Sequence, residues 1–421
     1  MSNRITDHIS YTELFSYFTD AESLITKLPK SWPSTHWKSI LNGTMSIDQL
    51  SAIEKSLSAE QVSAYEKLLT IINKINSKEA SDKDKAIASI YRSYITIYKL
   101  LPISIAQALV ESIQFQSEYL DLSENNIDDL QAIAIAEILP CTQISSLILR
   151  NNQIKNNGAI ALANTNLLTT LNLGNNQINI DRNIAGEKSA DAVAIAFSQC
   201  TSISDLSLDG SKFSIDGHKA LFANPRIKKI SFNHAHISTE IAQLYATSTT
   251  IGVIHLDENE LDPNTIISLA NNEFFVGMSL RYNNISDAVA AVLAQSKNLQ
   301  TLDISHCNLS DKGIAAFANT TIKELYSSNN KLTSSAPSTL AANPHLLITD
   351  FSHNNVAEVA IQTLSEEDPT KSYNIAITAG ATPEFPSLKR LSLFKTKKTA
   401  TPAATTVLPT ELKEDLNKNK M

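Results

Sequence analysis

Apolar residues recur at fixed spacing through most of this chain. In the stretch 147–170, Leu147 and Leu149 stand two positions apart, Asn152 follows three positions later, and small and apolar residues at helical spacing begin at Gly158. Spacing of two predicts a short strand, and helical spacing predicts a helix after it. One such unit cannot bury its own apolar face, so the pattern predicts stacked units that form a solenoid.

The unit repeats at a nearly constant interval. The second leucine-type position of each predicted strand, here called the marker residue, recurs after 27, 24, 35, 24, 24, 24, 24, 23 and 24 residues. Because the intervals cluster at one value, the sequence predicts about ten consecutive repeats. The marker residues are Leu122, Leu149, Leu173, Leu208, Phe232, Leu256, Leu280, Ile304, Ser327 and Phe351.

These units resemble leucine-rich repeats, which span ~20–29 residues each. A Gly-Ala-x-Ala-Leu-Ala signature is complete at 158–163 and partial at 217–222 and 313–318, and it resembles the repeats of bacterial effectors of the GALA family and of Legionella-type translocated effectors. The resemblance covers roughly residues 118 to 378. It implies a ribonuclease-inhibitor-like α/β horseshoe, with a parallel sheet on the concave side and helices on the convex side. It also implies an effector that binds a host protein.

Three regions follow from the extent of the repeats. Residues 1–115 lack the repeat and predict an all-α domain that caps the solenoid, in which Ser58 and Gln61 match a capping box at a helix start. Residues 116–380 form the predicted solenoid. Residues 381–421 are rich in Thr, Pro, Ala and Lys, a composition typical of a flexible tail.

One repeat is longer than the others. The interval of 35 residues exceeds the common interval of 24 by 11, and the excess falls near residues 180–187. Insertions in a solenoid form loops that often lie beside the binding face. A surface loop without function fits as well, because lengthening a loop costs little entropy. Both interpretations stay open.

The N-terminal region also resembles an F-box, the helical module that links substrate receptors to a ubiquitin ligase. The Leu-Pro that usually opens an F-box is replaced here by Ile9-Ser10. The alternatives are an F-box-like module, which implies a ubiquitin-ligase adaptor as partner, and a helical cap alone. The resemblance rests on the run 14–18 (LFSYF), Leu24, Leu28, Trp32 and Trp37.

Composition narrows the function and the compartment. The net charge of −8 argues against nucleic acid as the main partner, because phosphate binding needs concentrated Lys and Arg. Cys141, Cys200 and Cys307 lie far apart and form no disulfide framework, which favours a reducing compartment. No Sec-type signal opens the chain, and no apolar stretch approaches the ~20 residues of a membrane span.

The tail adds an expectation about export. It has a net charge of +4, and it carries Glu411, Glu414 and Asp415 near its end, which resembles the export signals of type IV-secreted effectors. We therefore expect secretion into the cytosol of a host cell by a route other than Sec. The alternative is an ordinary disordered terminus on a cytoplasmic protein.

Function is expected on the strand face that the leucines leave free. Three columns of residues lie one position before, one position after and two positions after the marker residues, and we call them the first, second and third columns. Equivalent positions of neighbouring strands align ~4.8 Å apart. Tyr and Arg in such columns favour a protein-binding surface in the later repeats. The predicted partner-binding residues are His255, Asp257, Glu258, Arg281, Tyr282, Asp303, His306, Tyr326, Asp350 and His353.

Other motifs favour structure over chemistry. Asparagines recur at the turn position, where a side-chain amide bonds free backbone groups, and Cys307 replaces one of them. The pair His234 and His236 has spacing compatible with zinc but lacks further ligands in sequence. No nucleophile with a base and no phosphate-binding glycine loop is evident. The sequence therefore predicts no enzyme, no cofactor and no metal site.

Overall fold

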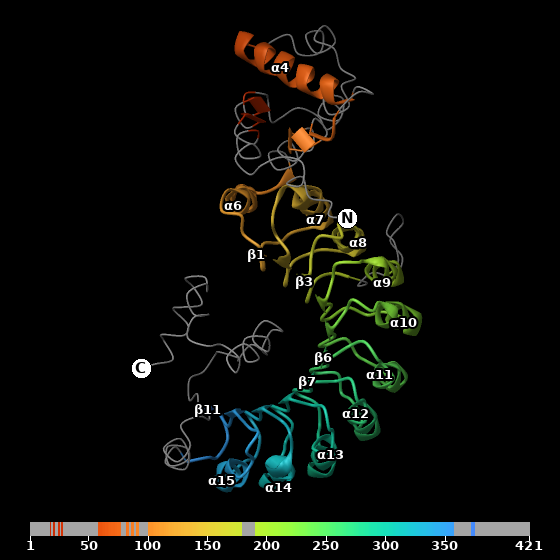
Figure 1. The fold of residues 1–421 in the computed structure, drawn as a ribbon, viewed down its shortest axis with the longest axis vertical. Helices are drawn as coiled ribbons and strands as arrows, with labels where there is room; N and C mark the ends of the chain where they lie inside the picture. Colours follow the sequence, from red (N-terminus) through yellow and green to blue (C-terminus); the bar gives the residue numbers. More distant parts are fainter. Residues whose placement is uncertain are drawn as a thin grey trace. The chain divides into compact units, whose positions relative to one another are not determined.

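The computed structural model of the protein contains a parallel sheet. The structure describes residues 58–76, 100–178, 190–357 and 372–374, and some residues within 17–27 and 81–91. In this part of the chain, eleven strands pair in sequence order from β1 to β11. Figure 1 shows the strands along one side of the repeats and the helices along the other. The predicted α/β solenoid is confirmed.

Each strand is three residues long, and its middle residue lies opposite the middle residue of the next strand. Leu147 pairs with Leu171, for example, and Leu302 with Leu325. The strands are β1 (Tyr119–Asp121), β2 (Ser146–Ile148), β3 (Thr170–Asn172), β4 (Asp205–Ser207), β5 (Lys229–Ser231), β6 (Val253–His255), β7 (Gly277–Ser279), β8 (Thr301–Asp303), β9 (Glu324–Tyr326), β10 (Ile348–Asp350) and β11 (Ser372–Asn374).

The helices between the strands begin at polar caps. Asp128 accepts a hydrogen bond from the Gln131 backbone N–H at 2.9 Å, and the Gln131 side chain accepts one from the Asp128 N–H at 3.1 Å. This capping box satisfies N–H groups that a helix start leaves free. The repeat helices are α7 (Asp129–Ile138), α8 (Asn156–Asn164), α9 (Ala190–Gln199), α10 (Ile215–Ala223), α11 (Thr239–Ala246), α12 (Pro263–Ala270), α13 (Asp287–Leu293), α14 (Asp311–Ala315) and α15 (Ser335–Ala341), with 3₁₀ turns η2 (Leu139–Cys141) and η3 (Ala316–Asn319).

The core lies between the sheet and the helices. Leu147 and Leu149 of one repeat, Ile154 of its turn and Leu162 of its helix are each at most 1% exposed. Burying a side chain of this size contributes about 1.5 to 3 kcal/mol. The leucines therefore hold neighbouring repeats together, as the period of the sequence predicts.

The region before the repeats contains helices α4 (Ala59–Asn76) and α6 (Ile103–Gln114). The predicted capping box at the start of α4 is confirmed, because Ser58 N–H donates to the Gln61 side chain at 2.8 Å and Gln61 N–H donates to Ser58 Oγ at 3.2 Å. The division into residues 1–115, 116–380 and 381–421 stays a prediction. Most of the F-box-like segment, with both tryptophans, lies outside the described residues.

The long interval does not disturb the sheet. β3 and β4 flank it and pair in the same register as the other strands, with Leu171 opposite Leu206. Residues 179–189 lie outside the described residues, so the role of the 180–187 insertion stays open. The strands on either side of the insertion therefore stack as the other strands do.

The predicted structural role of the turn asparagines is confirmed. Asn283 Nδ2 donates to the carbonyl oxygens of Leu256 and Leu280, both at 3.0 Å, and Asn283 Oδ1 accepts from the Leu261 N–H at 3.1 Å. Asn152 makes the same set of bonds in the second repeat. Each amide therefore joins the corner of its own repeat to the corner of the preceding one.

Cys307 occupies the asparagine position in its repeat and supplies only part of these bonds. Its Sγ donates to the carbonyl oxygens of Leu280 and Ser305 at 3.3 Å each. Burial raises the pKa of the thiol, so it stays protonated at neutral pH. We expect Cys307→Asn to raise the free energy of unfolding by about 1 kcal/mol, because the amide adds an acceptor and stronger donors. Urea unfolding measures this, and a loss of stability equal to that of Cys307→Ala would contradict it.

The glycines of the repeat signature allow neighbouring helices to approach closely. Asp129 Oδ1 accepts from the N–H groups of Lys155 at 2.7 Å and Gly158 at 2.9 Å in the next repeat. A Cβ at position 158 would lie 2.7 Å from this same oxygen. Gly217 and Gly313 face Asp191 and Asp287 in the same way. The signature therefore encodes contacts between repeats on the helix side.

His218 lies in an aromatic cluster beneath β5. It is 1% exposed, its Nδ1 is 2.8 Å from the Tyr245 hydroxyl, and its ring meets the Phe232 ring edge to face at 4.8 Å between centroids. Burial lowers the pKa of His218 to about 4. The folded state therefore favours the neutral ring.

A pH dependence of stability follows from this lowered pKa. As the pH falls from 6.5 toward 4, the unfolded chain gains a proton at His218 that the folded chain does not, so folding loses about 2 to 3 kcal/mol. We expect His218→Gln to reduce this loss, measured as urea midpoints between pH 7 and pH 4. The matched control is His345→Gln, which changes an exposed histidine outside the aromatic cluster and should keep the wild-type profile. Identical profiles for His218→Gln and wild type would contradict the prediction.

Candidate partner-binding surface

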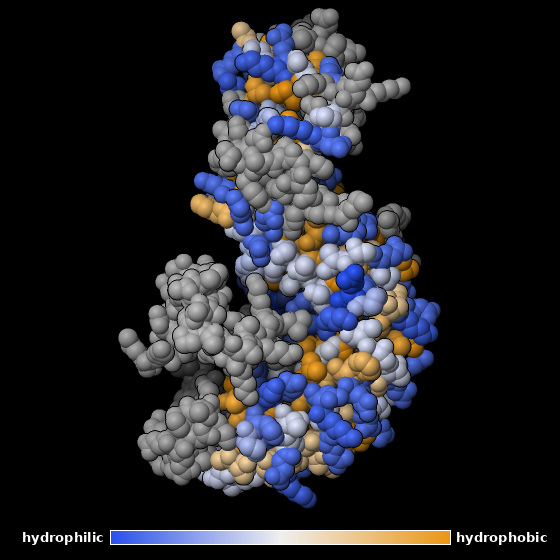
Figure 2. All heavy atoms as spheres, viewed as in Figure 1, coloured by the Kyte–Doolittle hydropathy of each residue, from blue (hydrophilic) through white to orange (hydrophobic). Residues whose placement is uncertain are grey.

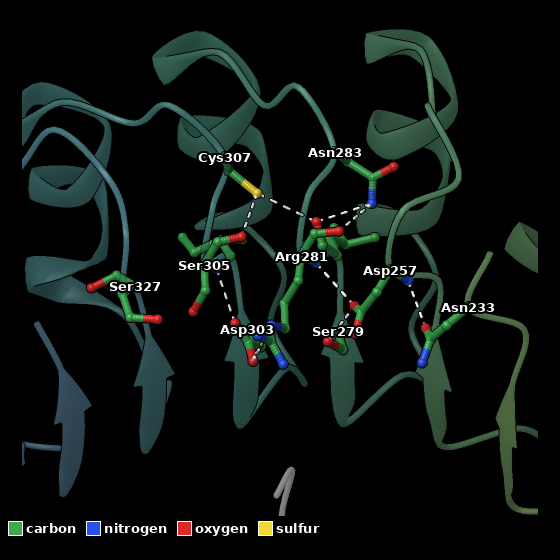
Figure 3. A network of polar contacts seen from close by, with 12 residues as sticks. Asn233, Asp257, Ser279, Arg281, Asn283, Asp303, Ser305, Cys307 and Ser327 are labelled. Atoms are coloured by element: carbon green, nitrogen blue, oxygen red, sulfur yellow. Dashed lines mark hydrogen bonds and ion pairs between the residues drawn. The ribbon is translucent and has the colours of Figure 1, made fainter. Parts of the chain in front are cut away.

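The candidate surface comprises side chains that face away from the leucine core. Several side chains of the first two columns form hydrogen bonds with the backbone. The N–H groups of Leu280 and Tyr282 donate to carbonyls of the following repeat. The N–H of Arg281, between them, points toward the preceding repeat, because successive N–H groups of a strand alternate in direction. Asp257 Oδ1 accepts this bond at 2.9 Å and a second one from Ser279 Oγ at 2.5 Å (Figure 3).

Other carboxylates of these columns accept hydrogen bonds from backbone groups just after their own strand. Asp303 Oδ1 accepts from the Ser305 N–H at 2.9 Å, and Asp350 Oδ1 accepts from the Ser352 N–H at 2.9 Å. Asp121 bonds Ser123 in the same way. Their acidic side chains therefore complete the hydrogen bonding of the sheet at its ends, a structural role that the sequence analysis did not anticipate.

Arg281 lies near two carboxyl groups, Asp257 and Asp303, whose pKa values are raised. Burial raises the pKa of Asp257 to about 7 and that of Asp303 to about 6, and each is also raised by a neighbouring carboxylate. Arg281 Nε is 3.8 Å from Asp303 Oδ2. Arg281 opposes the effect of burial, because its positive charge lowers the pKa of both carboxyl groups.

The predicted partner-binding residues separate into two groups by exposure. His255, Asp303, Tyr326 and Asp350 are buried, between 3% and 9% exposed, and Tyr326 donates from its hydroxyl to Glu324 at 3.2 Å. Asp257 and Arg281 are partly exposed. The remaining four all belong to the third column, and Tyr282 is 44% exposed. Partner contact by any of the ten stays a prediction. The partly or fully exposed third-column residues are Glu258, Tyr282, His306 and His353.

The third column has a left-handed backbone at every repeat. Its φ values lie between +52° and +75°. Asn151, Asn175 and Gly210 suit this conformation, whereas a bulky residue there is strained by about 1 to 3 kcal/mol. From His234 onward, every repeat except the one with Asn329 carries another residue type in this column, and we call these five residues the rim. The rim consists of His234, Glu258, Tyr282, His306 and His353.

Rim side chains contact one another along the turns. The Tyr282 and His306 rings stack at 3.9 Å between centroids with an interplanar angle of 19°. The Arg281 guanidinium carbon lies 5.6 Å from the centre of the Tyr282 ring. Farther along, His234 Nδ1 is 3.1 Å from Glu258 Oε2. These contacts restrict the positions of the rim side chains, although Tyr282 remains 44% exposed to solvent.

One polar column was missed by the sequence analysis. It lies two positions before the first column and contains Asp205, Lys229 and Glu324. Lys229 Nζ is 3.3 Å from Asp205 Oδ2, and burial raises the pKa of Asp205 while Lys229 opposes that shift. The alternation of a strand places these residues on the same face, so the period of two was the signal that could have found them.

Metal binding and membrane insertion find no support among the described residues. No group of three or more His, Cys, Asp and Glu side chains is placed to hold a metal ion there. None of the described helices is long and apolar enough to cross a membrane. Cys141, Cys200 and Cys307 are free and buried.

Comparison with known proteins supports the repeat architecture. The family profile described as Leucine Rich repeat matches residues 118–136, 141–163 and 295–318. No curated protein sequence matches the chain. Each of the three matched segments lies within the repeats that the structure shows, so the solenoid is a leucine-rich repeat fold.

Three solved structures are similar to parts of the chain. TLR13 in its complex with ssRNA13 is 17% identical, with a TM-score of 0.40, and covers 61% of this chain. The match spans only 39% of the TLR13 chain. An internalin (inlF) from Listeria monocytogenes is 15% identical with a TM-score of 0.35, covering 66% of this chain and 96% of its own. The mouse RP105/MD-1 complex is 14% identical with a TM-score of 0.33, covering 57% and 51%.

Proposed function

We propose that this leucine-rich repeat solenoid is a non-catalytic effector or scaffold that binds a host protein through its concave side, with the rim as the main contact. A leucine-rich repeat solenoid favours a protein-binding role, because stacked repeats present an extended surface to a partner. In this proposal, the buried first-column residues stabilise the backbone next to the rim. The exposed rim residues provide the contact.

The observation that carries the proposal is Tyr282. It adopts a left-handed backbone with φ of 56°, and 44% of its surface is exposed. A strained tyrosine contributes little to folding when nearly half of it is in solvent. Strain of this kind is typical of functional sites, and exposed Tyr is among the residues that most often anchor protein interfaces.

Proximity labelling in host cells tests the proposal. We expect Tyr282→Ala with His306→Ala to remove the proteins labelled by wild type. The matched control changes Asp216 and Lys219 to Ala, since this exposed ion pair on α10 lies away from the rim. Loss of the labelled set with the rim variant alone supports the proposal. The same labelled set with the rim variant and with wild type would overturn it.

We further propose that the chain reaches the cytosol of a host cell by a non-Sec route. The support is the resemblance of its repeats and tail to translocated effectors, and buried free cysteines fit a reducing compartment. A fusion to a cytosolic reporter enzyme, assayed in host cells, tests this. The absence of a signal in infected host cells would contradict entry into the host cytosol. A host-cell signal that persists when the infecting bacteria lack the type IV system would contradict type IV export as the route.

The alternative role is an F-box-like substrate receptor of a host ubiquitin ligase. It rests on the sequence of residues 14–37 alone. Co-purification with the ligase adaptor, lost when Leu14 and Phe15 are changed to Ala, would favour this role over simple binding. If the protein bound by the repeats is recovered without the adaptor, the result favours the scaffold proposal over this alternative.

A further inference from the structure

Four consecutive turns in the later repeats, at 281–285, 305–309, 328–332 and 352–355, contain no Asp or Glu. Earlier turns without acidic residues occur at 150–154, 174–178 and 233–237, but no four of them follow one another. The turn directly before the four carries Asp257, Glu258 and Glu260. The basic side chains of the four turns are Arg281, His306, Lys331 and His353. This basic run occurs in a chain whose net charge is −8.

The basic groups of these turns also act on one another. Burial and the positive charges of Arg281 and His353 lower the pKa of His306, which favours its neutral ring. The permanent positive charges in these turns are those of Arg281 and Lys331. Arg281 has one long ion pair, at 3.8 Å, with Asp303, whose own pKa is raised to about 6. The side chain of Arg281 is 18% exposed and that of Asp303 is 5% exposed, so the guanidinium is the more accessible of the two groups.

The stacked pair adds a flat surface to this charge. Tyr282 and His306 stack at 3.9 Å, and Arg281 lies over the tyrosine ring. Arginine next to an exposed aromatic ring suits carboxylates, because its planar N–H groups bind them in pairs. Exposed lysine and histidine side chains alone would bind a carboxylate weakly, because a single exposed ion pair contributes little free energy.

We infer that this segment of the rim binds an acidic stretch of the partner protein, with Arg281 pairing to a carboxylate and the Tyr282–His306 stack packing beneath the peptide. The inference rests on the proposed function and specifies its partner. Charge complementarity selects an acidic occupant over a basic one. Lys331 and His353 extend the contact along the following two turns.

Peptide binding to the full chain tests the inference. The probe is a fluorescein-labelled peptide of about 12 residues that alternates Glu and Ala, and its counterpart has Gln in place of every Glu. Fluorescence anisotropy is measured at about 50 mM salt, where charge pairing is only moderately screened. We expect the Glu peptide to bind at least about tenfold more tightly than the Gln peptide, a difference of about 1.4 kcal/mol.

Charge-matched variants locate the binding. Arg281→Gln with Lys331→Gln should abolish the preference for Glu. The control changes Lys219 and Lys312 on the outer helices to Gln, which removes the same net charge and should preserve the preference. Thermal unfolding by circular dichroism confirms that both variants are folded.

Two results would overturn the inference. One is equal affinity for the Glu and Gln peptides, and the other is an equal loss in the rim and control variants. If proximity labelling still depends on Tyr282 and His306 in that case, the proposed function stands and only the acidic partner is rejected. If proximity labelling is also insensitive to these residues, both proposals fail.

Discussion

Replacing Asn283 with alanine is expected to lower the free energy of unfolding by about 3 to 4 kcal/mol. The amide is 1% exposed and serves the Leu256 and Leu280 carbonyls and the Leu261 N–H. Each buried polar group left without a partner costs about 1 to 3 kcal/mol. Because these groups belong to two adjacent repeats, the substitution weakens both a corner and the contact between repeats.

Urea unfolding measures this loss, and hydrogen exchange locates it. We expect faster exchange in the turns after β6 and β7, since stability in a solenoid depends on contacts between neighbours. Asn284→Ala is the matched control, because Asn284 is the next residue and is exposed. A loss below about 1 kcal/mol, or one shared by Asn284→Ala, would show that the amide is not essential to the corner.

Replacing Gly158 with alanine is expected to cost about 2 kcal/mol, although alanine is the better helix former by about 1 kcal/mol. The added Cβ would lie 2.7 Å from Asp129 Oδ1 and 2.9 Å from Ala132 Cβ and from Ile154 Cγ2. To admit it, the two helices must separate. The separation stretches the bond that Asp129 accepts from Lys155 N–H.

The control for this substitution is Asn157→Ala, one residue earlier in the same helix. It removes no packing glycine and should leave stability unchanged or slightly higher. Denaturant titration of both variants gives the comparison. A gain of stability with Gly158→Ala would mean that helix propensity outweighs the close approach of α7 and α8.

The fold could be predicted because the repeat depends on residues that recur in sequence. Leu147 lies in β2, Leu149 follows the strand directly and Asn152 lies at the corner, so the spacing and the turn residue predicted strand, turn and helix in order. The same reasoning identified the asparagine bonds. Each of these features is local, and its interval is visible along the chain.

The candidate site was harder to predict because it depends on the register between neighbouring strands and on the sign of the backbone φ angle. That Asp257 bonds the Arg281 N–H becomes evident only when the two strands are aligned. The left-handed backbone at Tyr282 is set by the corner, not by the tyrosine. Asn151, Asn175 and Gly210 in the same column were the available signal, since these types prefer positive φ. The informative members of this column are the rim residues, which replace Asn and Gly in the later repeats.

Hydrogen exchange on the complex with a partner recovered by proximity labelling tests the rim most directly. We predict slower exchange of backbone amides in the turns at 281–285, 305–309 and 352–355 when the partner is bound, with outer helices α11 to α14 unchanged. Protection confined to the outer helices, with the turns exchanging as in the free protein, would contradict the assignment of the rim as the binding surface.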